Sequence, residues 1–224
     1  MTTSLIIGGS SGIGLAIATL ETQLGSRVAI VARSGERLAQ AAHSLRCEAI
    51  ASDLTAADST APLQSWLAAT AGLDTLYLAV GGGGIGDFAA QSQADFEYSL
   101  AVNLLAPSRA LRLCLPHMAA GSTVVFINSV AGLKPFPGWS AYSAAKAALR
   151  ALATSLREEL RPRGIRVISA HPFATDTPLW DTLPGTWDRS RMMQAADVAR
   201  VLCDAARAPV VLEEIHMASP HGVL

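Results

Sequence analysis

Half of the 224 residues are hydrophobic and only 16% are charged, a composition that excludes an intrinsically disordered chain and is typical of a buried, helix-covered sheet. The 17 basic residues nearly balance the 18 acidic ones, so the net charge of −1 excludes a broad basic surface for nucleic acid or an anionic membrane. This length fits one domain, and we expect a single domain over residues 1–224.

Short apolar runs alternate with longer segments of helical periodicity. Strands are expected at residues 5–7, 28–31, 76–80, 123–127, 167–170 and 210–217, with one more before Asp53. Helices are expected at 13–24, 36–45, 57–69, 95–115, 141–160 and 196–206, with Pro62 and Pro107 each marking a helix start or break. Repeated strand–helix–strand units predict a doubly wound parallel sheet. Residues 178–194 do not follow this alternation and are expected to form an excursion over the edge of the sheet.

Three cysteines, Cys47, Cys114 and Cys203, are far apart and each lies in an apolar segment. They offer neither a disulfide framework nor metal-ligand spacing, so we expect buried free thiols and no metal site. The N-terminal residues contain no cationic region before the first apolar stretch, and no apolar run reaches the ~18 residues that span a bilayer. A reducing, cytoplasmic setting is therefore expected.

A glycine-rich turn follows the first expected strand, in Gly8-Gly9-Ser10-Ser11-Gly12-Ile13-Gly14. Its first glycine permits a tight turn, Gly12 lets the backbone approach a pyrophosphate, and Gly14 lets the next helix pack on the strand. The helix N-terminus favours negative charge, and the two serines add hydroxyl donors. A bare tight turn is the alternative, but the position between strand and helix favours nucleotide binding.

Arg33 stands nineteen residues beyond Gly14, just after the second expected strand. A carboxylate there would pair with a ribose 2′-hydroxyl, whereas an arginine accommodates a 2′-phosphate. With Arg37 one helical turn later, Arg33 favours NADP(H) over NAD(H), unless it is only a solvated arginine at a helix start. Asp53, beside Leu54, is placed to accept a hydrogen bond from an adenine amino group, or else to cap a helix.

Tyr142 and Lys146 are four residues apart in an expected helix, and the polar Ser129 ends an apolar run thirteen residues upstream. The helical spacing puts the lysine ammonium on the same face as the phenol, about one turn away. A neighbouring positive charge favours the phenolate, so we expect the pKa of Tyr142 to be lowered toward neutrality. The pair predicts proton transfer, although an interfacial tyrosine and a solvated lysine would fit the same spacing.

Taken together, these motifs resemble the classical short-chain dehydrogenases/reductases over essentially the whole chain. The resemblance implies a Rossmann-like doubly wound sheet of about seven strands with helices on both faces. It also implies that Tyr142 is the catalytic acid/base, that Ser129 bonds the substrate oxygen, and that Lys146 binds nicotinamide ribose and lowers the tyrosine pKa. Asn103 would hold a water in a proton relay through Lys146.

The resemblance assigns further cofactor contacts, and the chain departs from the family pattern at some of them. Gly81 and Gly82 would contact the adenine ribose through their backbone, although Leu78 and Ala79 replace the usual asparagines there. Pro172, Thr175 and Thr177 would follow the sixth strand, with Thr175 reaching the carboxamide and Thr177 a phosphate. His171-Pro172-Phe173 replaces the usual Asn-Pro-Gly, which puts bulk beside the nicotinamide, and Ile7 stands where threonine is common.

The apolar residues expected around the pocket predict that the substrate is a hydrophobic carbonyl compound or secondary alcohol. The expected pocket residues are Trp139, Leu179, Trp180, Leu183, Trp187, Met192 and Met193. These side chains could instead pack against the core or a neighbouring subunit. Small residues along the helix at 141–160, Ala144, Ala147, Ala148 and Ala151, predict a homodimer or homotetramer, or else close packing within the subunit.

The function expected from the sequence is hydride transfer between NADP(H) and a carbonyl or alcohol substrate. A protein that binds the nucleotide as a sensor or scaffold without turnover is the alternative, given the altered glycine run and Phe173. An epimerase or dehydratase would need a longer substrate domain than the chain provides.

Overall fold

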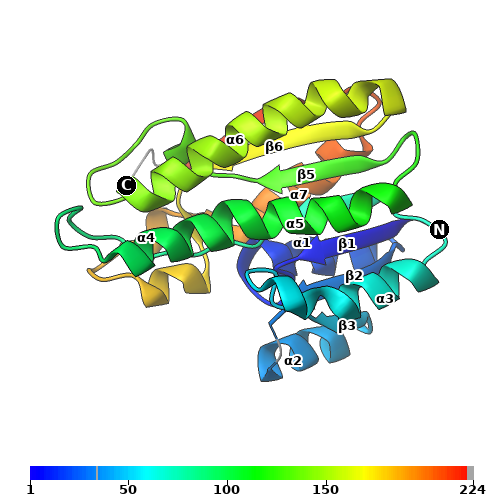
Figure 1. The fold of residues 1–224 in the computed structure, drawn as a ribbon, viewed down its shortest axis with the longest axis horizontal. Coiled ribbons are helices and arrows are strands. Elements are labelled where there is room, and N and C mark those ends of the chain that lie inside the picture. Colours follow the sequence, from blue (N-terminus) through cyan, green and yellow to red (C-terminus); the bar gives the residue numbers. More distant parts are fainter. Residues whose placement is uncertain (34, 221–224) are drawn as a thin grey trace.

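The computed structural model describes residues 1–33 and 35–220 (Figure 1). Its strands are β1 (Thr3–Ile7), β2 (Arg27–Ala32), β3 (Glu48–Ala51), β4 (Thr75–Leu78), β5 (Thr123–Ile127), β6 (Arg166–Pro172), β7 (Thr175–Asp176), β8 (Met193–Gln194) and β9 (Glu214–Met217). Its α-helices are α1 (Gly12–Gln23), α2 (Glu36–Leu45), α3 (Ala61–Ala69), α4 (Gln93–Leu100), α5 (Ala106–Cys114), α6 (Ser140–Leu160) and α7 (Ala195–Arg207).

A seven-stranded parallel sheet forms the centre of the molecule, in the order β3-β2-β1-β4-β5-β6-β9. Ile7 of β1 lies opposite Val31 of β2 on one side and Leu78 of β4 on the other. Because all strands are parallel, their carboxyl ends meet at one edge of the sheet, the left edge in Figure 1. The predicted doubly wound α/β fold is confirmed.

Helices cover both faces of the sheet. Helices α3, α5 and α6 pack on the face that presents Leu5 and Phe126, and α1, α2 and α7 pack on the face that presents Ile6 and Val125. Neighbouring residues of a strand enter opposite layers because their side chains alternate between the faces. Burial on both faces explains why the strands read as unbroken apolar runs.

The helix expected at 95–115 is interrupted. A π-helical turn at Ala101–Leu105 separates α4 from α5, and Pro107 lies in the first turn of α5, where its missing N–H is tolerated. Pro62 similarly lies at the start of α3, after a 3₁₀ turn at Ala57–Thr60. Both prolines therefore mark helix starts, as expected.

The C-terminal part differs most from the expected elements. The strand predicted at 210–217 is confined to Glu214–Met217, and Val210 and Val211 before it are exposed. The excursion at 178–194 consists of 3₁₀ turns at Pro178–Thr182 and Arg189–Arg191, and its end pairs with the segment after β6 as the short β7-β8 ladder.

Cys47, Cys114 and Cys203 are free thiols. Cys114 and Cys203 are buried as expected, whereas Cys47 is only half-buried. Burial raises the pKa of the Cys114 thiol to about 12, so this thiol stays protonated at neutral pH. Within residues 1–33 and 35–220, no helix has both the length and the apolar character needed to cross a bilayer.

A buried carboxylate joins α1 to α7 across one face of the sheet. Glu21 is fully buried and accepts hydrogen bonds from Ser4 (2.9 Å), Ser26 (2.7 Å) and Tyr77 (2.6 Å). Arg207 of α7 adds two charge-assisted bonds of 2.8 and 2.6 Å. Burial alone would raise the pKa of Glu21, but the bonds from Arg207, Tyr77 and Ser26 lower it to about 2.

Replacing Glu21 should therefore destabilise the fold. We expect Glu21→Gln to lower the free energy of unfolding by roughly 3 kcal/mol, because it leaves Arg207 without its buried counter-charge. The folded-state pKa of Glu21 lies below the ordinary glutamate value of 4.5, so its contribution to stability is complete above pH 4.5 and is lost as the pH falls toward 2. Urea denaturation between pH 2 and pH 7 measures both effects.

Glu158→Gln is the matched control, since Glu158 and Arg161 form an exposed pair. It should change the free energy of unfolding by at most about 1 kcal/mol. Equal losses for the two variants would contradict a structural role for the buried network.

Candidate active site

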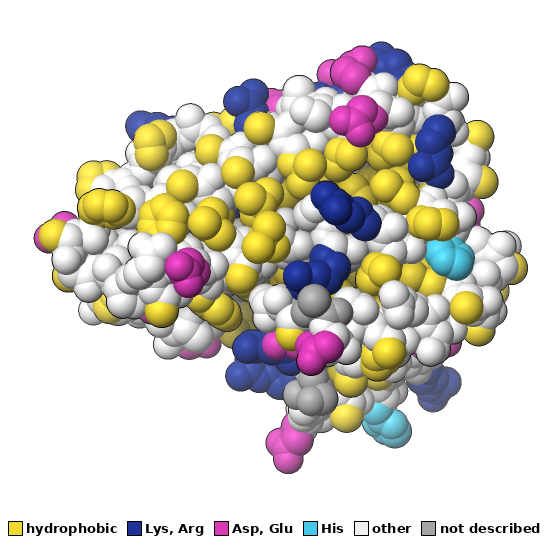
Figure 2. All heavy atoms as spheres, viewed as in Figure 1, with side chains coloured by type: hydrophobic (Ala, Val, Ile, Leu, Met, Phe, Trp, Pro, Cys, Tyr) yellow, Lys and Arg dark blue, Asp and Glu magenta, His cyan; other side chains and the backbone are white. Residues whose placement is uncertain are grey.

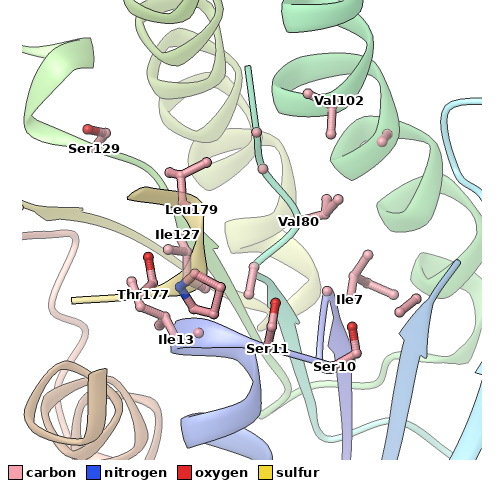
Figure 3. Close-up of a pocket in the computed structure, with 18 of the residues that line it drawn as sticks. Ile7, Ser10, Ser11, Ile13, Val80, Val102, Ile127, Ser129, Thr177 and Leu179 are labelled. Carbon is pink, nitrogen blue, oxygen red and sulfur yellow. The ribbon is translucent and has the colours of Figure 1, made fainter. Parts of the chain in front are cut away.

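A cavity of about 950 Å³ opens at the carboxyl edge of the sheet. Figure 3 shows Ser10 and Ser11 on the turn before α1, with Ser129, Thr177 and Leu179 on other loops around the same space. The volume lies near the top of the range of roughly 300–1,000 Å³ typical of ligand sites.

Most of the residues expected in the site line this cavity. They are Gly8, Ser10, Ser11, Gly12, Ile13, Arg33, Asp53, Leu54, Gly81, Gly82, Ser129, Tyr142, Lys146, Pro172, Thr175 and Thr177. Gly14 and Asn103 are not among the lining residues. The fold therefore brings motifs from six separate loops into one space, with two residues set behind its wall.

Glycines shape the turn between β1 and α1. Gly8 has a φ of 86°, in the left-handed region, and its amide donates to the carbonyl of Val31 (2.7 Å). A Cβ on Gly14 would lie 2.2 Å from the carbonyl oxygen of Gly8, so only glycine lets α1 begin directly against the turn. The first residues of α1 face the cavity, and its first turn carries no acidic side chain. An anionic group is favoured there by the helix amides and dipole.

Thr177 meets this turn from the segment after β6. A Cβ on Gly12 would lie 3.2 Å from the side chain of Thr177. The hydroxyl of Thr177 therefore borders the same anion-binding end of α1 as Ser10 and Ser11 (Figure 3).

Arg33 and Arg37 are exposed and line one end of the cavity, where Glu36 is also present. Asp53 is half-buried nearby, and its Oδ1 accepts hydrogen bonds from the hydroxyl (2.7 Å) and amide (3.0 Å) of Thr55. These bonds are the main cause of a lowered Asp53 pKa, with a smaller contribution from Arg33. The carboxylate thus caps a local turn and at the same time borders the cavity.

Ser129 and Tyr142 meet at the other end of the cavity. Ser129 directly follows β5 and Asn128, and Tyr142 lies in the first turn of α6. The side chain of Asn128 accepts from the Ser129 amide (2.9 Å), and the Ser129 hydroxyl oxygen accepts from the amide of Ala131 (3.1 Å), which fixes the serine. The Ser129 hydroxyl is also close enough to the phenol of Tyr142 to favour its charged form.

Lys146 is almost completely buried one helical turn after Tyr142. Its ammonium donates to the carbonyl of Ile127 (3.1 Å) and lies 5.6 Å from the centre of the Tyr142 ring. Burial lowers the pKa of Lys146 to about 8, because the charged form is poorly solvated. The two side chains lie on one helix face without direct contact between the ammonium and the phenol, as the spacing predicts.

The expected lowering of the Tyr142 pKa is wrong for this structure. Burial raises the pKa of Tyr142, and the nearby Ser129 side chain only partly opposes that rise. The phenolate loses more solvation in the cavity wall than it regains from its polar neighbours. Ser129, not Lys146, supplies the lowering contribution.

Asn103 lies in the π-helical turn and is fully buried. Its amide nitrogen donates to the carbonyls of Gly82 (2.6 Å) and Ser99 (2.9 Å), and its side-chain oxygen accepts from the Gly82 amide (3.2 Å). Asn103 therefore fixes the backbone after β4, close to Lys146, whose Nζ would lie 3.6 Å from a Cβ on Gly81. Its role in a proton relay remains a prediction.

The departures after β6 are accommodated without backbone strain. Phe173 lines the cavity, and its amide donates to the carbonyl of Met217 (2.9 Å). Among the non-glycine residues that the structure describes, Arg46 alone has a positive φ, so Phe173 adds bulk in an ordinary conformation. His171 is fully buried and donates from Nδ1 to the carbonyl of Ser129 (3.4 Å).

Tryptophans form an aromatic wall beside Tyr142. The Trp139 ring centre lies 5.5 Å from that of Tyr142, 6.1 Å from Trp180 and 6.5 Å from Trp187, in edge-to-face arrangements. Trp180 is fixed by a hydrogen bond from its ring nitrogen to the carbonyl of Thr175 (2.8 Å). The wall narrows the cavity next to the phenol with rigid apolar surfaces.

Three of the expected pocket residues lie elsewhere. Leu183 and Met192 are buried, Met193 packs against the core on the α7 face, and none of the three lines the cavity. The 3₁₀ turns of the excursion direct these side chains inward, whereas Leu179, Trp180 and Trp187 do line the cavity.

Asn128 and Phe136 are among the lining residues that were missed in the sequence. Asn128 holds the amide of Ser129 and has a buried amide nitrogen without a hydrogen-bond partner. A polar residue at the end of an apolar strand identifies Ser129, and the same signal applies to Asn128. Phe136 also lines the cavity, but a single aromatic residue between two prolines gives no comparable signal.

Comparison with known proteins identifies the family. The family model described as short chain dehydrogenase matches residues 2–186. The chain is a short-chain dehydrogenase. The chain spans about half the length of the 3-dehydrosphinganine reductases that it matches.

Individual relatives agree with this assignment. The chain is 33% identical over 184 residues to a 3-dehydrosphinganine reductase of Arabidopsis thaliana, and the match covers 77% of this chain but only 55% of that protein. The crystal structure of a dehydrogenase/reductase from Sinorhizobium meliloti is 30% identical, with a TM-score of 0.88 over 98% of this chain and 94% of that one. An alcohol dehydrogenase from Thermococcus sibiricus, solved with 5-hydroxy-NADP, is 26% identical, with a TM-score of 0.90 over 99% and 97% of the chains.

The cavity of this short-chain dehydrogenase fits a dinucleotide. Its anion-favouring turn has no side chain at Gly8 or Gly12 that would block close approach of a phosphate, and the cavity continues from there to Ser129 and Tyr142. Ser10, Ser11 and Thr177 would hold the phosphates by their hydroxyls.

The buried amine of Lys146 can be observed directly, because Lys134 and Lys146 are the only two lysines of the chain. In a Lys134→Arg variant labelled with ¹³C-lysine, the remaining side-chain NMR signal should titrate with a midpoint near pH 8. Lys146 would thus lose its charge as the pH rises through that value. A midpoint above pH 10, that of a solvated lysine, would contradict the burial of its ammonium.

Proposed function

We propose that the chain transfers a hydride between NADP(H) and an apolar ketone or secondary alcohol, with Tyr142 as the proton donor or acceptor. The observation that carries this proposal is the meeting of Ser129 and Tyr142 at the end of a cavity whose other end carries the glycine turn and Arg33. Relatives named as a 3-dehydrosphinganine reductase and an alcohol dehydrogenase support a ketone or an alcohol as the reacting group of the substrate.

Ser129 and Tyr142, next to the aromatic wall, have different roles toward the substrate oxygen. NADPH, when bound, supplies the hydride that reduces the carbonyl carbon. Ser129 and Tyr142 donate hydrogen bonds to the carbonyl oxygen, where negative charge develops, and Tyr142 gives it a proton. In the reverse direction Tyr142 accepts the alcohol proton.

Lys146 supplies a positive charge to this end of the cavity below about pH 8. Burial raises the pKa of the resting phenol, which keeps Tyr142 protonated for reduction, and Ser129 partly stabilises the phenolate that remains after proton transfer. Asn103 supports the cofactor indirectly, by holding the backbone at Gly82.

The aromatic wall supports an apolar substrate. Phe136, Trp139, Phe173, Leu179, Trp180 and Trp187 surround the space near Tyr142. Among the described lining residues, Lys146 is the charged side chain of this end. The other charged ones lie after β2, at the start of α2 and after β3: Arg33, Glu36, Arg37 and Asp53. A substrate carboxylate or phosphate would find no arginine partner beside the reacting carbon.

The outer face of α6 supports association of two copies or more. Ala144, Ala147 and Ala151 are exposed along it, and Leu105, between α4 and α5, is also exposed. Figure 2 shows hydrophobic side chains spread over the face on which α5 and α6 lie. A homodimer or homotetramer would cover them. The free thiols support a reducing, cytoplasmic location.

Replacing the phenol tests the proton transfer. Tyr142→Phe should lower kcat for NADPH oxidation with a panel of apolar ketones at least about 100-fold, because the general acid is lost. The Kd for NADPH, measured by fluorescence titration, should stay close to that of the wild type.

Tyr98→Phe is the matched control, since it removes another phenolic hydroxyl from the cavity lining and should keep a rate near that of the wild type. A wild-type protein that binds NADPH but oxidises it with no ketone would favour the sensor or scaffold function instead.

Cofactor choice depends on Arg33. Arg33→Ala should weaken NADPH binding by about 1.5–3 kcal/mol, the contribution of a charge-assisted hydrogen bond, and leave NADH binding nearly unchanged. Arg112→Ala, an exposed arginine of α5 outside the cavity, should change neither Kd. Similar losses for the two cofactors would refute the role of Arg33 in binding a 2′-phosphate.

A further inference from the structure

Two histidines and a glutamate meet at the β9 edge of the sheet, and none of them lines the cavity. His171 of β6 lies opposite His216 of β9, and Ser169 lies opposite Glu214 in the same register. Residues two apart in a strand point to the same face, so Glu214 and His216 both point toward the α6 side, where Arg150 contacts Glu214. One ring nitrogen of each histidine and a carboxylate oxygen of Glu214 all lie within 4.8 Å of one another.

We propose that His171, Glu214 and His216 bind a divalent zinc-type ion. Two imidazoles and one carboxylate form a ligand set that zinc uses with water in the fourth position, and imidazole ligands disfavour magnesium and calcium. The sequence does not reveal this site, because the histidines are forty-five positions apart and only the pairing of β6 with β9 brings them together.

The distances are close to those that a tetrahedral ion requires. Ligand atoms about 2.0–2.1 Å from zinc lie roughly 3.3 Å from one another. Nε2 of His216 is 3.6 Å from Oε2 of Glu214, so this pair needs little adjustment. No two of the three ligand atoms lie more than 4.8 Å apart, so the widest pair must close by at most about 1.5 Å. The exposed ring of His216 has room to make this movement.

His171 is held in the tautomer that a metal ligand needs. Its Nδ1 donates to the carbonyl of Ser129 (3.4 Å), which leaves the lone pair on Nε2. Metal-binding histidines generally donate their second nitrogen to a carbonyl or carboxylate in this way. Nε2 now accepts from the hydroxyl of Ser169 (3.1 Å), and this hydroxyl can rotate away when an ion binds.

The site is open on one side and closed on the other. His171 is fully buried, Glu214 is half-buried and His216 is exposed, so an ion can enter from the surface at β9 and reach a rigid ligand beneath. Binding would fasten the edge strand β9 to β6 at His171, whose Nδ1 contacts the carbonyl of Ser129.

Arg150 of α6 competes with the ion for the carboxylate of Glu214. Its guanidinium donates to both carboxylate oxygens of Glu214, from Nε to Oε1 (2.9 Å) and from Nη2 to Oε2 (3.1 Å). An ion on Oε2 would displace the second bond and leave the first in place. The positive charge of Arg150 opposes the ion, so removal of Arg150 should improve binding.

Isothermal titration of the full chain with Zn²⁺, without NADPH, tests this site independently of the proposed reaction. We expect one ion per chain, a higher Tm in the presence of Zn²⁺, and the visible absorption of four-coordinate Co²⁺ when Co²⁺ replaces it. His216→Ala and Glu214→Gln should each weaken Zn²⁺ binding tenfold or more, since changes outside the ligand shell alone cost about 10–100-fold.

Two further variants make the result specific. His43→Ala removes an exposed histidine of α2 and should bind Zn²⁺ like the wild type, whereas Arg150→Gln should bind it more tightly. The proposal is overturned if the wild type shows no saturable site, if His216→Ala binds as tightly as His43→Ala, or if Arg150→Gln weakens binding as much as Glu214→Gln.

Discussion

The parallel sheet with β1 near its centre is the constraint on which the site depends. β2 and β3 lie on one side of β1, and β4, β5 and β6 lie on the other. The loops that leave β1 and β4 therefore diverge to opposite faces, and a crevice forms between them at the carboxyl edge. At the floor of this crevice a Cβ on Gly8 would lie 2.7 Å from the backbone nitrogen of Val80. Glycine is required there because the turn and the β4 loop touch.

The same geometry buries two ionisable groups close together, the ammonium of Lys146 and the phenol of Tyr142. Lys146 lies against the carboxyl end of β5 and the loop after β4, and Tyr142 lies one helical turn earlier at the cavity wall. Burial disfavours both the ammonium and the phenolate, so each group is shifted toward its neutral form. A phenol with a raised pKa gives its proton only to a strong base. A developing alkoxide on the substrate is such a base.

Much of the architecture could be predicted from the sequence, because periodicity and glycine spacing are local signals. The strands around the site, the turn at Gly8 and the spacing of Tyr142 and Lys146 follow from such signals. The π-helical turn that buries Asn103 does not, since an amide bonded to Gly82, twenty-one residues away, depends on tertiary contacts. The network at Glu21 and the pair of His171 and His216 were also invisible, because both require neighbouring strands and helices to be assembled.

The pKa of Tyr142 shows where residue spacing alone misleads. Four residues on a helix give proximity, but the sign of the shift depends on how much solvent the phenol loses, which only the packed structure determines. Similarly, apolar residues at 178–194 could not be divided into Trp180 and Trp187, which line the cavity, and Leu183 and Met192, which are buried. Hydrophobicity gives the tendency to be buried but not the direction of each side chain.

A crystal structure of the chain with NADPH tests the central claim most directly. We expect the adenosine 2′-phosphate beside Arg33, the pyrophosphate at the N-terminus of α1, and the nicotinamide next to the hydroxyls of Tyr142 and Ser129. A nicotinamide ring far from Tyr142, or a phenol turned away from the cavity, would contradict the assignment of this residue to proton transfer.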